Sequence, residues 1–202
     1  MFLSIMEYLP KTPLEIVATI LSCIAVIMFV VSVTFKNKNK LVLSQATAHI
    51  FLIFSESVSG AWSGVVQDVI GLVRNICVYF KKNTKIVNIV LITLGGVVGV
   101  YANLFTTNFF TPWKGLEFGE WYGYLPVIAN LEYSIVVLKK DIHVKWIKLA
   151  FAISSTLWGI TFVLTGNSLL LSGILNFITG VVAFISFISM CRNKEIELKN
   201  RD

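Results

Sequence analysis

The chain has 202 residues, of which 56% are hydrophobic and only 14% charged, whereas a typical soluble domain is about 25% charged. A soluble domain of this length cannot keep so much apolar surface out of water, so the composition excludes one and indicates a protein that lies in lipid. The net charge of +6 would suit nucleic acid in a soluble protein. Here its placement along the chain points to membrane orientation, and we expect no nucleic-acid partner.

Seven apolar runs follow one another, each close to the roughly 20 residues that cross about 30 Å of hydrocarbon. They cover residues 14–34, 41–57, 61–80, 86–105, 121–138, 144–165 and 169–191. The first has no small-residue cleavage site after it, so we expect a retained helix and not a signal peptide. The third is the most polar, and a surface amphipathic helix is its alternative. The sequence therefore predicts an all-α membrane protein with seven transmembrane helices.

The basic residues gather on alternate connections between these runs. Fourteen of the 17 follow the first, third, fifth or seventh run: Lys36, Lys38, Lys40, Lys81, Lys82, Lys85, Lys139, Lys140, Lys145, Lys148, Arg192, Lys194, Lys199 and Arg201. Only Lys11 and Lys114 lie on the other side, and Arg74 is inside the third run. Because cytoplasmic loops carry the excess of lysine and arginine, this pattern predicts an N-terminus outside the cytoplasm and a C-terminus inside it.

The remaining segments carry weaker signals. The longest outer connection, residues 106–120, is rich in aromatic residues, which indicates either a belt at the headgroup level or a short lid over an external vestibule. The polar tail, residues 192–202, is expected to fray and to lie in the cytoplasm. The three cysteines lie in or at the end of apolar runs without a CxxC pair, so we expect neither a zinc site nor a redox motif.

A short repeat links the third and seventh runs. Residues 63–71 and 172–180 both read S-G-x-x-[QN]-x-x-x-G, at an offset of 109 residues, and the same offset pairs His49 with Trp158. The two runs are four crossings apart, so they point the same way through the membrane. This predicts a parallel 3+1+3 repeat of the SWEET/PnuC-like kind within one transmembrane domain, residues 1–191. Residues 14–80 and 121–191 form the two bundles, and residues 86–105 form the linker helix.

Several short stretches resemble a known family. Residues 60–64 (GAWSG) and 70–75 (IGLVRN), followed by Lys81-Lys82, resemble the helix-three region of the bacterial inner-membrane YgjV-type proteins, and Leu125-Pro126 is similar to that family as well. The family usually has an asparagine ahead of its Arg-Asn, where this chain has Gln67-Asp68. It is grouped with the SWEET, PQ-loop and nicotinamide-riboside (PnuC-like) transporters. The resemblance implies a multi-pass protein of the bacterial inner membrane that carries a small solute between two three-helix bundles.

Polar groups within hydrocarbon are costly, so each one in these runs needs a reason. Gln67 and Asn176 hold matching positions in the repeat. We expect their amides to converge between the bundles, where amide donors and acceptors suit a neutral hydroxylated or heterocyclic solute. Asn130, Trp158 and His49 are further candidate walls of this pocket. The alternative for all five residues is ordinary packing and interhelical hydrogen bonding.

Three charged residues and a proline are further candidates. Asp68 lies about 100° around the helix from Gln67, so the two are not expected to face the same pore squarely. Asp68 pairs with a cation, binds a proton or is a structural partner. Arg74 either snorkels to the interface or forms an ion pair, with Glu132 as its natural partner. Pro126 is a candidate hinge, or else a tolerated kink.

No enzyme motif is present: the sequence has no HExxH, GxSxG or GxxxxGK[ST]. We therefore expect no catalytic residue, metal or cofactor. The main prediction is a transporter that carries a neutral polar metabolite, such as a vitamin precursor, nucleoside or sugar, by facilitated diffusion or ion coupling. The alternative is a non-transporting membrane protein: a sensor, an assembly factor or a partner subunit. Two fused bundles can complete a pore alone, so a monomer suffices, and the oligomeric state stays open.

Overall fold

The computed structural model describes residues 12–59, 62–109, 121–165 and 170–199, and these are helical with short turns. The elements are α2 (Pro13–Thr34), α3 (Lys38–Ser59), α4 (Trp62–Tyr79), α5 (Lys85–Phe109), a short 3-10 helix η1 (Trp121–Tyr124), α6 (Leu125–Val137), α7 (Val144–Thr165) and α8 (Leu170–Lys199). Each predicted apolar run coincides with a helix, and the described residues contain no strand. The all-α prediction is confirmed. The aromatic stretch of residues 110–120 lies outside the described residues.

Four helices are long and apolar enough to cross a membrane: α2, α3, α7 and the first part of α8, as far as Arg192. Their outer faces carry exposed isoleucine, leucine, valine and phenylalanine, whereas serines, amides and charged residues are buried between the helices. A protein that is apolar outside and polar inside has lipid as its solvent. The chain is therefore a membrane protein. α4, α5 and α6 do not meet the same criteria of length and hydropathy within the described residues.

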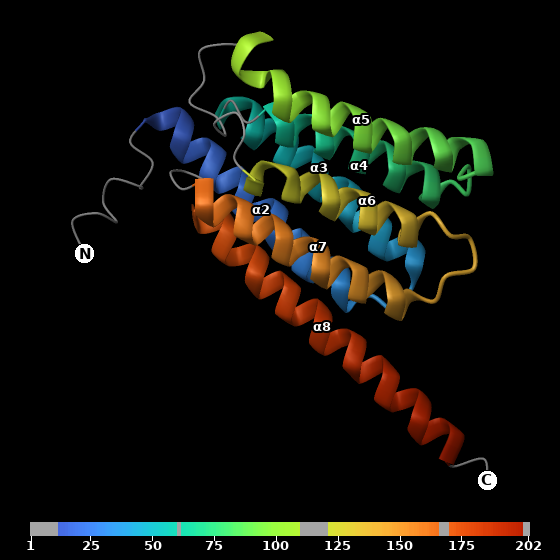
Figure 1. The fold of residues 1–202 in the computed structure, drawn as a ribbon. Helices are drawn as coiled ribbons and strands as arrows, with labels where there is room; N and C mark the ends of the chain where they lie inside the picture. The colour runs from blue at the N-terminus through green and yellow to red at the C-terminus, as the bar shows by residue number, and fades with distance from the viewer. Residues whose placement is uncertain (1–11, 60–61, 110–120, 166–169, 200–202) are drawn as a thin grey trace.

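Six helices form a closed ring, and the seventh packs outside it. α2 packs on α3, α3 on α4, α4 on α6, α6 on α7, α7 on α8, and α8 returns to α2. A hydrogen bond from Ser172 to Ser22, 2.7 Å long, joins α8 to α2 at this closure. α5 lies outside the ring against α4 and α6, and the start of α2 and the end of α8 lie at opposite ends of the bundle (Figure 1).

Three basic turns meet at one end of the ring. The Lys38 ammonium donates to the backbone carbonyl of Lys139 at 2.7 Å, which joins the α2–α3 turn to the α6–α7 turn. The Asn83 amide donates to the carbonyl of Leu138 at 2.8 Å, which adds the α4–α5 turn. The lysines of these three turns therefore lie on the same side of the molecule, as positive-inside topology requires.

The turn that follows α4 contains a lysine in the left-handed backbone conformation. Lys81 has a φ of 56°, and the N–H groups of Lys81 and Lys82 donate to the carbonyls of Val78 and Cys77. This is the hydrogen-bond pattern of a Schellman motif, in which the left-handed residue is usually glycine. A side chain in that conformation costs about 1–2 kcal/mol.

Lys81→Gly is expected to stabilise the protein, because glycine adopts this φ without strain. After the entropy that glycine adds to the unfolded chain, the gain should be about 0.5–1 kcal/mol. It would be measured as a rise in the midpoint of thermal unfolding. Lys82→Gly removes the same charge at the next position and should give no gain. A rise that is equal in both variants would show that charge, and not backbone strain, is responsible.

Two predictions about helices need correction. The apolar part of α8 ends at Arg192, one residue from the predicted end of the run, but the helix continues through the polar tail, which was expected to fray, as far as Lys199. The stretch after Cys191 contains no glycine or proline, so nothing in it breaks the helix. Pro126 does not lie inside a continuous helix, because α6 begins at Leu125 and Pro126 is in its first turn. Proline loses no intrahelical hydrogen bond there, so Pro126 marks the junction of η1 with α6 and does not kink a membrane helix.

Candidate functional site

A small cavity lies inside the ring. Its volume is about 40 Å³, and each of the six ring helices contributes to its wall, whereas α5 contributes none of the lining residues. The polar part of the wall is made by His49, Glu56, Gln67, Asp68, Arg74, Asn130, Ser154, Ser155 and Asn176. The rest is mostly aromatic: Phe29, Leu52, Tyr133, Phe151, Trp158 and Phe162. The five residues predicted as pocket walls all lie on this cavity.

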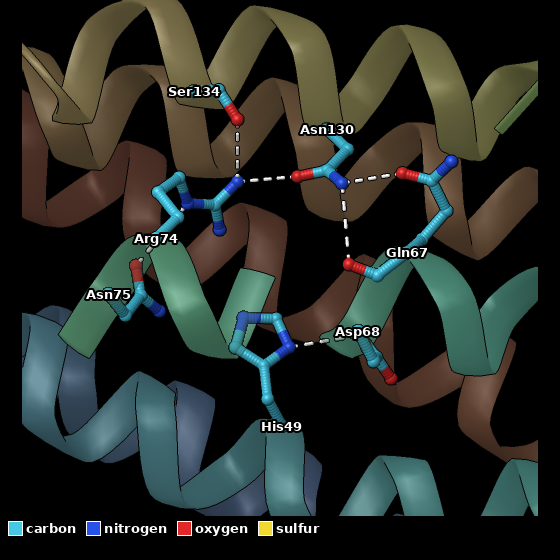
Figure 2. A network of polar contacts seen from close by, with 7 residues as sticks. All are labelled: His49, Gln67, Asp68, Arg74, Asn75, Asn130 and Ser134. Carbon is cyan, nitrogen blue, oxygen red and sulfur yellow. Dashed lines mark hydrogen bonds and ion pairs between the residues drawn. The ribbon is translucent and has the colours of Figure 1, made fainter. Parts of the chain in front are cut away.

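Gln67 and Asp68 both line the cavity, although they are neighbours on α4. They line it from different sides of the helix, in keeping with the expectation that they do not face one pore squarely. α4 packs between α3 on one side and α5 and α6 on the other, so a wide arc of its surface faces the interior. Gln67 is directed toward α6 and Asp68 toward α3 (Figure 2). The same contacts pack α4 against three other helices, and its crossing of the membrane stays a prediction.

Arg74 is the centre of a hydrogen-bond network between α4 and α6. Its side chain is 2% exposed, and Nη1 donates to Asn130 Oδ1 and, at 2.9 Å, to Ser134 Oγ (Figure 2). The guanidinium carbon also lies 4.7 Å from the centroid of the Tyr133 ring, a distance that suits a cation–π contact. The predicted pairing of Arg74 with Glu132 is therefore wrong.

Glu132 is on another face of α6. Asn130, Tyr133 and Ser134 follow the i, i+3, i+4 spacing of one helix face, and Glu132 falls outside it. Its side chain is half-buried and is not among the lining residues of the cavity. It therefore has no part in this site.

The amide of Asn130 extends the hydrogen-bond network to Gln67. Asn130 Nδ2 donates to Gln67 Oε1, and Gln67 Nε2 donates to the backbone carbonyl of Gly95 on α5 at 3.2 Å. Gly99, one turn further along α5, leaves the space that the Gln67 side chain fills, since a Cβ there would lie 1.9 Å from Gln67 Nε2. Arg74, Asn130 and Gln67 thus join α4, α5 and α6 through buried polar atoms.

Asp68 has a histidine as its partner. His49 Nδ1 lies 2.9 Å from Asp68 Oδ1, and the His49 ring packs edge-on against Phe29 at 5.4 Å between centroids. Gly71 makes room for this imidazole, because a Cβ at that position would lie 2.7 Å from it. His49 and Asp68 were predicted as separate site residues, and the structure brings them together as one pair.

Glu56 is a site residue that the sequence argument missed. It is 1% exposed and lies on the cavity wall, which Asp68 also lines. A Cβ at Gly64 would lie 2.5 Å from its carboxylate, so the glycine makes space for it. Glu56 is at the end of the predicted run of residues 41–57. An acidic residue at that position is typical of the boundary between membrane and water. The signal that could have found Glu56 is Gly64, the second residue of the repeat in the next helix.

Asn176 and Trp158 complete the wall on the opposite side. Asn176 is 8% exposed, and its Nδ2 donates to the carbonyl of Ser172 in its own helix at 2.9 Å. Trp158 packs against Phe162 at 5.2 Å between ring centroids. Gln67 on α4 and Asn176 on α8 therefore line the same cavity, although no hydrogen bond joins them.

Comparison with known proteins gives no family for this chain: no family model matches it, and no curated protein or solved structure matches it either. What the site can do is therefore argued from its geometry. Within the described residues, no group of three His, Cys, Asp or Glu side chains could hold a metal ion. A cavity of about 40 Å³ holds a few water molecules at most. A metabolite can enter only if the helices around it move apart.

Proposed function

We propose that the chain is a small-solute membrane transporter, and not an enzyme, which carries a neutral polar metabolite between two three-helix bundles. The observation that supports this most is the wall of the cavity: α2, α3 and α4 on one side and α6, α7 and α8 on the other all contribute to it, and α5 does not. Ligand sites of carriers built from repeats lie at the interface of the two repeats. The conformation described here would be the closed one, with the site occluded.

Matching positions of the repeat support the same proposal. Gln67 and Asn176 both line the cavity, and so do His49 and Trp158. The glycines match as well: Gly71 packs against His49 of α3, and Gly180 packs against Ala152 and Thr156 of α7. α4 therefore meets α3, and α8 meets α7, through a glycine at the same position of the repeat. A parallel 3+1+3 repeat accounts for both similarities.

The proposed topology has seven crossings of a bacterial inner membrane, with the N-terminus outside and the C-terminus in the cytoplasm. Its support is the cluster of three basic turns at one end of the ring, which would face the cytoplasm. α4 and α6 carry the polar network and would be shielded from lipid by their neighbours, which is how polar membrane helices are tolerated. Kinship with the YgjV-type and SWEET/PnuC-like carriers is part of this proposal.

A non-transporting role, as a sensor, assembly factor or partner subunit, is the second candidate. It is favoured by the small volume of the cavity and by the hydrogen bonds that Gln67, Asn130 and Arg74 make to one another. In that case the network would serve only to join helices. The two candidates differ in whether a solute binds inside the ring.

A solute screen with a cavity-filling variant tests the proposal. The purified protein would be heated with vitamin precursors, nucleosides, sugars and amino acids, and a ligand at 100 times its dissociation constant should stabilise it by about 2.7 kcal/mol. Ser154 lies on the cavity wall and is 6% exposed, so Ser154→Phe should fill the cavity and abolish both this stabilisation and uptake into liposomes.

The matched control is Ile153→Phe. Ile153 is the neighbouring residue and is 45% exposed on the outer face, so the added ring should leave binding and uptake unchanged. Both variants must remain monodisperse in detergent. If no compound of the panel stabilises the wild-type protein, the non-transporting candidate is favoured. If a compound binds equally well to Ser154→Phe, the pocket is elsewhere.

A further inference from the structure

The cavity wall carries two carboxyl groups but only one permanently positive group. The titratable or charged side chains on its wall are His49 and Glu56 from α3, Asp68 and Arg74 from α4, and Tyr133 from α6, and the lining residues from α2, α7 and α8 include none. The guanidinium of Arg74 is therefore matched by two carboxyl groups, those of Glu56 and Asp68, whose residues are 1% and 3% exposed. A buried carboxylate without a compensating charge is costly. The site thus lacks one positive charge.

The two carboxyl groups lie next to each other. A Cβ at Gly64 would lie 2.5 Å from the Glu56 carboxylate, and Asp68 is one turn further along the same face of α4, so both carboxyl groups face the same part of the cavity. Within the described residues, no donor reaches either oxygen of Glu56 or Oδ2 of Asp68. Two ionised carboxylates have only acceptors, so a hydrogen bond joins them only when one of them carries a proton. Asp68 Oδ1 is already engaged by His49 at 2.9 Å, which leaves Oδ2 for this contact.

We propose that Glu56 and Asp68 hold one proton between them, and that this proton is the coupling ion of the carrier. The coupling role rests on the proposed transport function, whereas the proton site does not. A proton fits better than a metal cation. A hard cation such as Ca²⁺ needs six to eight oxygen ligands, and the surrounding wall is largely aromatic and amide.

Loading the site is a simple proton transfer. A hydronium ion gives a proton to a carboxylate oxygen: one of its O–H bonds breaks and leaves a water molecule, a new O–H bond forms on the carboxyl group, and the reverse step on the other side of the membrane restores the carboxylate. Asp68 directly follows Gln67, whose amide joins α4 to α5 and α6. A change of charge on the pair therefore occurs beside the network that holds the two bundles together. Binding or release of the proton at this position would shift the equilibrium between the closed ring and an open one.

The pH dependence of unfolding tests the proton site without any solute. The purified full chain would be unfolded at equilibrium in mixed micelles between about pH 5 and pH 8. Unfolded Asp and Glu are ionised there, since they titrate near ~3.9 and ~4.3. The folded protein then binds one proton more than the unfolded chain, so stability is highest at low pH. The folding equilibrium constant should fall about tenfold per pH unit while the pair keeps its proton.

Glu56→Gln is the decisive variant. Its amide supplies the donor to Asp68 at every pH, so we expect a folded protein that has lost this tenfold slope. Glu132 lies outside the cavity, but among the described residues its Oε2 is buried without a hydrogen-bond partner and adds a slope of its own, so both proteins are compared in a Glu132→Gln background. Asp141→Asn removes an exposed carboxyl group and should keep the slope. If Glu56→Gln does not fold, Asp68→Asn takes its place, because its amide donates to Glu56 in the same way.

Three results would overturn the proposal. The first is a wild-type protein without the slope. The second is a slope that persists in Glu56→Gln but disappears in His49→Gln, which would place the proton on the imidazole. The third is stability that depends on Na⁺ in place of K⁺ and not on pH, which would make the occupant a metal cation. None of these results affects the solute screen, so the carrier proposal fails or stands separately.

Discussion

Arg74→Leu is expected to be the most damaging single substitution in the described part of the chain. Leucine supplies no donor, so Asn130 Oδ1 loses the hydrogen bond from the guanidinium, and Ser134 loses its charged partner. Asp68 and Glu56 would also be left in the ring without a cation among the lining residues. Breaking a buried charge arrangement by removing one member costs about 3–5 kcal/mol. We expect this loss in the free energy of unfolding in mixed micelles.

Two further variants separate charge from geometry. Arg74→Lys keeps the positive charge but not the planar fork that reaches two acceptors, so its loss should be intermediate. Arg192→Leu removes an exposed arginine and should change stability by less than about 0.5 kcal/mol. If Arg74→Leu is as stable as Arg192→Leu, the network does not hold α4 to α6.

The helices were predictable because an apolar run in the sequence marks each of them, although within the described residues only α2, α3, α7 and α8 are long and apolar enough to cross a membrane. The seven runs and the seven long helices agree closely, and the largest difference is at α8, which continues to Lys199. The end of α8 was predicted from hydropathy, which indicates where the chain leaves the hydrocarbon. The helix propensity of the residues after Cys191, which contain no glycine or proline, favours a continued helix. Pro126 was misplaced for a similar reason, because hydropathy alone does not separate η1 from α6.

The members of the site were predictable, and their partners were not. The cost of polar groups in hydrocarbon selected Gln67, Asp68, Arg74, Asn130 and Asn176, all of which line the cavity. Partner choice depends on how each helix is rotated about its axis, and one residue corresponds to about 100° of rotation. That rotation is set by packing between helices.

The error about Arg74 illustrates this limit. Glu132 was chosen for its charge, yet the face of α6 that carries Asn130 also carries Tyr133 and Ser134 at helical spacing, and this face meets Arg74. The spacing was visible in the sequence, and giving it more weight than charge would have led to the observed partners. The omission of Glu56 has a different cause: its depth depends on Gly64, and therefore on how closely α4 approaches α3.

Two glycines of α5 should respond to alanine with opposite signs. At Gly99 a Cβ would lie 1.9 Å from Gln67 Nε2 and 2.9 Å from Val127 Cγ2, whereas at Gly96 it would meet Leu131 at 3.5 Å, an ordinary contact. Gly99→Ala must displace Gln67 from Asn130 and from the carbonyl of Gly95. Overpacking of this kind costs about 1–3 kcal/mol. Gly96→Ala should instead stabilise the protein by about 0.5–1 kcal/mol, because alanine favours the helix.

A double-mutant cycle shows whether the clash at Gly99 acts through the network. Gln67→Ala removes the side chain that the new Cβ would strike, so Gly99→Ala should cost less in that background, by about 0.5–3 kcal/mol. The contact with Val127 remains in both backgrounds and accounts for any residual loss. Thermal unfolding of the four proteins gives the coupling energy directly. Equal costs in both backgrounds would mean that Gln67 moves aside freely. In that case its hydrogen bonds to Asn130 and Gly95 contribute little, and the amide is free to contact a solute.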